Sequence, residues 1–152
     1  MSAAKSLLLI ALFSALHSSV LTDTPFNLCA TDIVSIIITN FNLNNCQTSS
    51  CVLIRGQRLF MSLTATFLKE VGAKNDTTVT FEIRGGPFPV SLTVPVCRKV
   101  QCPIPAGDIR QPSVNLPVPE YIPLGTYIAR ASVKDGGLTV LCGENEVVIA
   151  DA

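Results

Sequence analysis

The chain has 152 residues, which is enough for one domain with a sizeable hydrophobic core. It carries eleven basic and eleven acidic side chains, so its formal net charge is zero. This balance leaves no electrostatic basis for binding nucleic acid or for strong attachment to anionic membranes.

The N-terminal segment has the form of a secretory signal peptide. Lys5 precedes an apolar stretch over residues 7–16, and small or polar residues follow. The apolar stretch is too short to span a membrane. We predict a signal peptide over residues 1–20, ending between residues 15 and 23, and a single mature domain over residues 21–152. A short buried N-terminal helix is the alternative interpretation.

Alternation of apolar and polar residues predicts antiparallel strands along the mature chain. Strands are expected at residues 33–38, 59–67, 79–83, 127–133 and 147–149. Asp135-Gly136-Gly137 stands between two such runs and indicates a hairpin. About seven strands, without a convincing long amphipathic helix, predict an all-β, immunoglobulin-like β-sandwich of two antiparallel sheets.

All six cysteines follow the predicted signal peptide, and an even number in a secreted chain indicates three disulfides. Spacing favours Cys46–Cys51 and Cys97–Cys102 as small loops that each enclose four residues. Cys29 then pairs with Cys142 and joins the first segment of the mature chain to the last. Zinc binding is the alternative. We expect no metal site, because the mature chain has no C-x-x-C pattern and no histidine.

A glycosylation motif, Asn75-Asp76-Thr77, follows Gly72 in a polar turn. We predict Asn75 as a glycosylation site of the secreted chain.

The mature chain offers little for catalysis. His17 is the one histidine, and it lies in the predicted signal peptide. With every cysteine paired, neither a Ser-His-Asp nor a Cys-His arrangement can form. Glu144 and Glu146 would share one strand face, and we interpret them as a solvated edge rather than the carboxylate pair of a hydrolase. We predict that the protein is not an enzyme and needs no cofactor.

The inward faces of the predicted strands combine small and large side chains: Ala65, Ala129 and Ala131 beside Phe67, Phe81 and Tyr127. Small side chains between two sheets can allow close packing, or they can leave room for a ligand. An unfilled cavity costs stability, about 24 cal/mol per Å3, and three disulfides can offset this cost.

Residues 88–105 combine strand alternation with four prolines and two cysteines. Proline cannot donate to a ladder, so this segment is predicted to be an edge strand or a bulge. The ordered motifs Phe88-Pro89-Val90, Cys102-Pro103-Ile104, Leu116-Pro117-Val118 and Glu120-Tyr121, together with the six cysteines, resemble the ML-domain lipid-recognition family. The segment over residues 123–142 is also similar to the closing hairpin of that family. The resemblance covers Cys29 to about Ile149.

The resemblance implies a sandwich with an apolar cavity between the sheets, which binds one lipid and hands it to a membrane or a partner protein. On that resemblance, Phe88, Pro89 and Val90 line the cavity entrance, with Tyr121 and Ile122 close by. Further wall residues, chosen from the inward alternation, are Phe67, Phe81, Ile83, Val96 and Tyr127.

We therefore predict a monomeric, secreted or endolysosomal protein that binds and transfers a lipid such as a sterol. Many sterol-binding members have aromatic residues between the C-P-I and L-P-V motifs, where this chain has Ile109 to Ser113. Sterol, fatty acid and phospholipid are therefore all open as ligands. An extracellular recognition module on the same fold is the alternative function.

Overall fold

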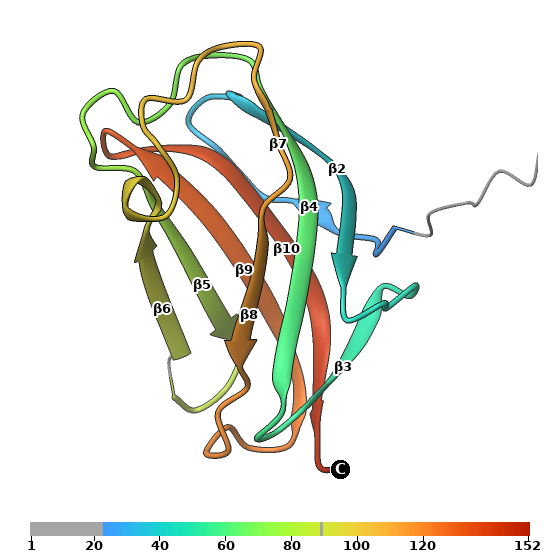
Figure 1. The fold of residues 1–152 in the computed structure, drawn as a ribbon. Helices are drawn as coiled ribbons and strands as arrows, with labels where there is room; N and C mark the ends of the chain where they lie inside the picture. Colours follow the sequence, from blue (N-terminus) through green and yellow to red (C-terminus); the bar gives the residue numbers. More distant parts are fainter. Residues whose placement is uncertain (1–22, 89) are drawn as a thin grey trace, which may run out of the picture.

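The computed structural model describes residues 23–88 and 90–152 (Figure 1). The predicted signal peptide and Pro89 lie outside the described residues. The described residues form ten strands and one short 3-10 helix. Their bounds are β1 (Asn27–Leu28), β2 (Ile36–Leu43), β3 (Ser50–Ile54), β4 (Arg58–Phe67), β5 (Thr78–Arg84), β6 (Val90–Pro95), η1 (Val96–Arg98), β7 (Ile109–Arg110), β8 (Ser113–Pro117), β9 (Gly125–Asp135) and β10 (Leu138–Ala150).

The strands form two sheets that face each other, as the alternation predicted. The large sheet has the order β1-β10-β9-β5-β6, and β3 also pairs with β10. The small sheet has the order β2-β4-β7, and β8 also pairs with β4. The segment rich in proline forms β6 at one edge of the large sheet, which confirms the predicted edge position.

Two details of the predicted sandwich are corrected. The described residues form ten strands rather than about seven, because the two-residue strands β1 and β7 have no alternation long enough to reveal them. One pairing is parallel, since β3 leaves the neighbourhood of β2 and joins the large sheet beside β10, with Cys51 opposite Val147.

The strand predicted at residues 33–38 begins later and continues further, as β2. Ile33 and Val34 lie before it and are exposed. The backbone N–H groups of Asp32 and Ile33 donate to the carbonyl of Thr139, which turns this segment toward the start of β10. The last strand, predicted at 147–149, extends over the whole of β10.

The hairpin between β9 and β10 is confirmed. Asp135 lies opposite Leu138, and Gly136 and Gly137 between them have φ values of 58° and 82°. Glycine adopts such left-handed conformations without a steric penalty, which explains its use at both turn positions.

Three disulfides join Cys29 to Cys142, Cys46 to Cys51 and Cys97 to Cys102. The first crosses between β1 and β10 and ties together the two ends of the described domain. No helix among residues 23–88 and 90–152 is long and apolar enough to cross a membrane.

The buried core consists of two clusters between the sheets. The first, which we call the lower cluster after its place in Figure 1, includes Leu53, Ile122, Tyr127, Val147 and Ile149. The second, the upper cluster, includes Ile36, Ala65, Phe67, Val71 and Ile104.

Candidate functional site

The inner face of the large sheet, the face that meets the small sheet, is filled unequally. On β10 and β3, the inward side chains Cys51, Val147 and Ile149 are almost completely buried. On β9, in the middle of the sheet, the inward residues Ala129 and Ala131 are only half-buried. Ala129 packs against the lower cluster, whereas Ala131 belongs to neither cluster.

Four apolar or small residues of the inner face lie in one row across four strands. Leu92 on β6 lies opposite Phe81 on β5, Phe81 lies opposite Ala131 on β9, and Ala131 lies opposite Gly143 on β10. We call these four residues the middle row. Neither core cluster includes any of them. Leu92 retains 45% of its exposure although it shares a face with Phe81, so no side chain of the small sheet covers this end of the row.

The opposite end of the middle row is closed by aromatic side chains. A Cβ atom added at Gly143 would lie 3.3 Å from Cδ2 of Phe26, so the phenyl ring occupies the place of the missing side chain. Phe26 in turn contacts Phe41 edge to face, with ring centroids 5.1 Å apart. The row is thus open at β6 and closed near β2, with apolar or small residues along its length.

The edges beside the open end have no covering strand. β6 pairs with β5 alone, and β7 and β8 pair with β4 alone. In Figure 1, β6 forms the left edge of the large sheet.

A family model of the ML domain matches residues 23–149, which is most of the chain. The chain belongs to the ML-domain family. The lipid-recognition resemblance seen in the sequence motifs is therefore confirmed, and the sandwich described above is a lipid-binding fold.

Solved structures of other proteins have a fold similar to that of this chain. A Niemann-Pick type C2 protein from the Japanese carpenter ant is 15% identical, covers 83% of this chain and 99% of its own, and superposes with a TM-score of 0.60. The C-terminal domain of wzt is 14% identical, covers 86% of this chain and 82% of its own, and has a TM-score of 0.56. At these identities the likeness is one of fold. Comparison with curated protein sequences gave no match.

The residues predicted for the cavity lie in several different parts of the ML domain. Ile83, Val90, Ile122 and Tyr127 lie together in or against the lower cluster, and Phe81 lies in the middle row. Phe67 is buried in the upper cluster, and Val96 is half-buried in η1. Phe88 and Tyr121 are exposed by 64% and 69% in loops below the sheets. Pro89 lies outside the described residues.

Two residues of the middle row, Leu92 and Gly143, were not among the predicted cavity residues. Leu92 alternates with Val90 and Val94 in the sequence, so the period of two could have identified it. Gly143 carried no signal, because the close approach of Phe26 to a glycine is a contact between distant segments.

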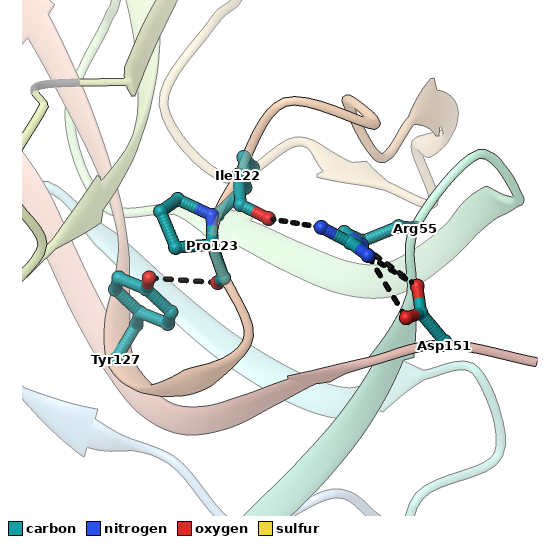
Figure 2. Close-up of polar contacts among 5 residues, drawn as sticks. All are labelled: Arg55, Ile122, Pro123, Tyr127 and Asp151. Atoms are coloured by element: carbon teal, nitrogen blue, oxygen red, sulfur yellow. Dashed lines mark hydrogen bonds and ion pairs between the residues drawn. The ribbon is translucent and has the colours of Figure 1, made fainter.

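The loop that carries Tyr121 is anchored to the framework of the ML domain (Figure 2). Tyr127 donates its hydroxyl proton to the carbonyl of Pro123 at 2.7 Å, and Nη1 of Arg55 donates to the carbonyl of Ile122 at 3.3 Å. Arg55 also pairs with Asp151. Tyr127 lies against the β5–β6 connection as well, since a Cβ added at Gly86 would lie 2.5 Å from its ring. Tyr127 therefore links the two loops that expose Phe88 and Tyr121.

The outer face of the large sheet is polar and carries two hollows. One hollow of about 290 Å3 is lined by residues that include Thr80, Glu82, Arg130 and Lys134. The carboxylate of Glu144 pairs with Arg130 there at 3.0 Å, and each side chain retains 30% exposure. Glu144 lies between β1 and β9, so it is not the solvated edge residue that we expected. Among residues 23–88 and 90–152, no group of acidic, cysteine or histidine side chains could hold a metal ion.

Proposed function

We propose that the protein holds one lipid in an apolar cavity between its sheets and transfers it between membranes. The single observation that carries this proposal is the half-burial of inward apolar residues along the middle row, at Leu92, Phe81 and Ala131. In a tightly packed sandwich such residues would be covered by the facing sheet. Here a ligand would cover them instead.

The energetics of such binding are favourable without polar contacts. Removing about 300 Å2 of apolar lipid surface from water contributes about 7 kcal/mol before the ordering costs of binding. A sterol, a fatty acyl chain or one chain of a phospholipid offers apolar surface for such binding. The protein thus acts as a carrier and not as an enzyme.

The lower loops are suited to brief contact with a membrane. Phe88, Tyr121 and Leu124 are each more than half exposed, and they lie in the two connections at the lower end of Figure 1. Aromatic side chains are enriched at the membrane–water interface, where apolar rings meet lipid headgroups. Because Tyr127 links the two connections, both can approach a bilayer together.

Secretion fits the chemistry of the chain. Three disulfides persist in an oxidising compartment such as the extracellular space or an endolysosomal lumen. Asn75 is exposed in the loop after Val71, where its side chain is available to a glycosyltransferase. We propose that the mature protein is secreted and carries a glycan at Asn75.

A matched pair of variants on one strand tests the location of the lipid. Ala131→Phe places a ring in the middle row, whereas Ser132→Phe places the same ring on the outer face of β9. The protein is incubated with mixed-lipid vesicles, reisolated and examined by native mass spectrometry. We expect wild type and Ser132→Phe to carry lipid, and Ala131→Phe to lose at least about tenfold in uptake. Wild-type protein that stays lipid-free would refute the carrier function and favour a recognition module.

A further inference from the structure

The strand β6 has one free edge (Figure 1). It pairs with β5 alone, and just beyond it the backbone N–H of Val96 donates to the carbonyl of Thr77 at 2.9 Å. In an antiparallel pair, the backbone groups of successive residues point alternately toward the partner strand and away from it. Because the N–H of Val96 points toward β5, the groups of Ser91 and Thr93, at odd separations from it, point away from β5.

The outward backbone groups of Ser91 and Thr93 are available for pairing. Both residues are exposed, and neither bonds through its backbone to another segment of the described chain. Pro95 is the next outward residue, and it has no N–H, so pairing is confined to the part of β6 before it. That part carries no charged side chain of the kind that opposes pairing at many sheet edges.

The sequence of this edge is symmetric about Leu92. A hydroxyl residue lies on each side of it, at Ser91 and Thr93, and a valine lies beyond each of these, at Val90 and Val94. When two copies of one strand pair about a two-fold axis, each residue meets the one at the mirrored position. A strand with this sequence therefore matches itself, with valine opposite valine and hydroxyl opposite hydroxyl.

Pairing centred on Leu92 would satisfy the free backbone groups. Ser91 would lie opposite Thr93 of the second copy, and these two residues would exchange two hydrogen bonds, which the two-fold axis repeats. Leu92 would face its own copy in a non-hydrogen-bonded pair, where the Cα atoms are about 4.5 Å apart and the side chains approach closely.

The inner face of the large sheet leaves this contact accessible. Leu92 points inward and still has 45% exposure, so the small sheet does not extend over β6. A second copy that joins edge to edge continues the sheet with its inner face on the same side. The two leucines would then cover each other at a place that neither small sheet reaches.

We infer that the free edge of β6 is a docking surface for a second copy of this chain, through an antiparallel β6–β6 pair centred on Leu92. A pair of short strands buries less than the roughly 1,200 Å2 of a stable interface, so the dimer is weak and forms at high protein concentration. This inference departs from the monomer that we expected from the sequence. It does not depend on lipid binding, so either proposal can fail without the other.

Sedimentation of the disulfide-bonded protein over a concentration series, from about 10 μM to about 1 mM, measures the association. We expect the apparent mass to rise toward twice that of the monomer and no further, because a two-fold pair is closed. Ser91→Pro removes an outward N–H without removing a bond to β5, and should raise the dissociation constant at least about tenfold. Ser91→Ala keeps the N–H and should dimerise like the wild type.

Three outcomes of this series would overturn the inference. Wild type that stays monomeric at the highest concentration has no such dimer. An apparent mass that continues beyond that of a dimer indicates a head-to-tail contact instead of a two-fold one. Dimerisation of Ser91→Pro equal to that of the wild type places the contact on another surface.

A charge exchange tests the position of the two-fold axis. Leu92→Lys and Leu92→Glu each set like charges opposite each other, so each variant alone should stay monomeric, and an equal mixture should form a heterodimer. Ile37→Lys and Ile37→Glu are the matched controls, since Ile37 on β2 has 46% exposure, and each should dimerise like the wild type. Dimerisation of Leu92→Lys alone, or no recovery in the mixture, would contradict pairing centred on Leu92.

Hydrogen exchange of the wild-type protein covers the case in which a variant does not fold. We expect the amide exchange of Ser91 and Thr93 to slow as the concentration rises, because these N–H groups gain partners. The exchange of Lys74, in an exposed loop, should stay the same. Unchanged exchange at Ser91 and Thr93 while the apparent mass doubles would show that the dimer uses another surface.

Discussion

The two sides of the sandwich differ in how they are closed. On the side of β10, β3 and β2, the inward residues Val147, Ile149 and Cys51 have at most 1% exposure. On the side of β6 and β8, Leu92 faces the other sheet and still has 45% exposure. The sealed side supplies the packed core that stabilises the domain. The open side leaves an apolar residue of the inner face uncovered.

The sealed side is closed by bonds between the N-terminal segment and β10, and the open side has no such bonds among the described residues. On the sealed side, the Cys29–Cys142 disulfide and the hydrogen bond from Asn145 to Pro25 join the N-terminal segment to β10. On the open side, Arg110 lies opposite Ala65 on the inner face at the edge strand β7 and pairs with Asp108. Inward charges on an edge strand oppose pairing with another strand.

We expect the largest difference in the free energy of unfolding between variants that lack one or the other disulfide. Cys29 and Cys142 are 113 residues apart, whereas Cys97 and Cys102 are five apart. In the chain-entropy model, removing the long link with paired alanines costs about 5 kcal/mol and removing the short one about 2 kcal/mol. Urea unfolding of the two double variants measures both. Equal losses would mean that closure of the sealed side does not depend on its long covalent link.

Two leucines provide a matched comparison of packing. Leu53 on β3 has 2% exposure on the sealed side, and Leu92 has 45% on the open side. We expect Leu53→Ala to lower the free energy of unfolding by about 3 kcal/mol, since it leaves a cavity. Leu92→Ala should cost less than about 1 kcal/mol, because little of its surface is buried. A large loss at Leu92 in lipid-free protein would show that the open side is packed in solution.

Tyr127 tests the attachment of the lower loops. Tyr127→Phe removes the hydroxyl that donates to Pro123 and leaves the ring in place (Figure 2). The expected loss is about 1 kcal/mol. Hydrogen exchange of the loop over residues 119–124 should increase while that of β10 is unchanged. Unaltered exchange in the loop would mean that the hydroxyl does not anchor it.

The smallest effect is expected at the exposed ion pair of Arg55 and Asp151. The carboxylate is 58% exposed, so solvent screens it. Asp151→Asn should cost less than about 1 kcal/mol, and the cost should decrease further in high salt. A larger loss would indicate that Arg55 needs its partner to hold the carbonyl of Ile122.

The sequence was informative where one face of a strand is continuously apolar. Runs at residues 59–67 and 79–83 predicted β4 and β5 to within one residue, because alternation reflects burial on one face. The first nine residues of β10 include Cys142, Gly143, Glu144 and Asn145 and have no such pattern. Pairing with β9 and β1 makes them a strand, and that pairing is not visible in the local sequence.

The candidate site was predictable only in part for the same reason. Alternation identifies which side chains point inward, and it correctly placed Phe81 and Ile83 on the inner face. It does not say whether the facing sheet covers them. The exposure of Leu92 depends on how far the small sheet extends, which the local sequence does not show.

The central claim, that lipid occupies the open side and leaves the sealed side unchanged, is tested most directly by methyl NMR of the intact protein. Spectra are recorded before and after loading from vesicles. We expect the methyl signals of Leu92, Ala131 and Ala129 to shift, while those of Val147 and Ile149 stay in place. Shifts concentrated at Val147 and Ile149, or none on the inner face after confirmed uptake, would contradict the account.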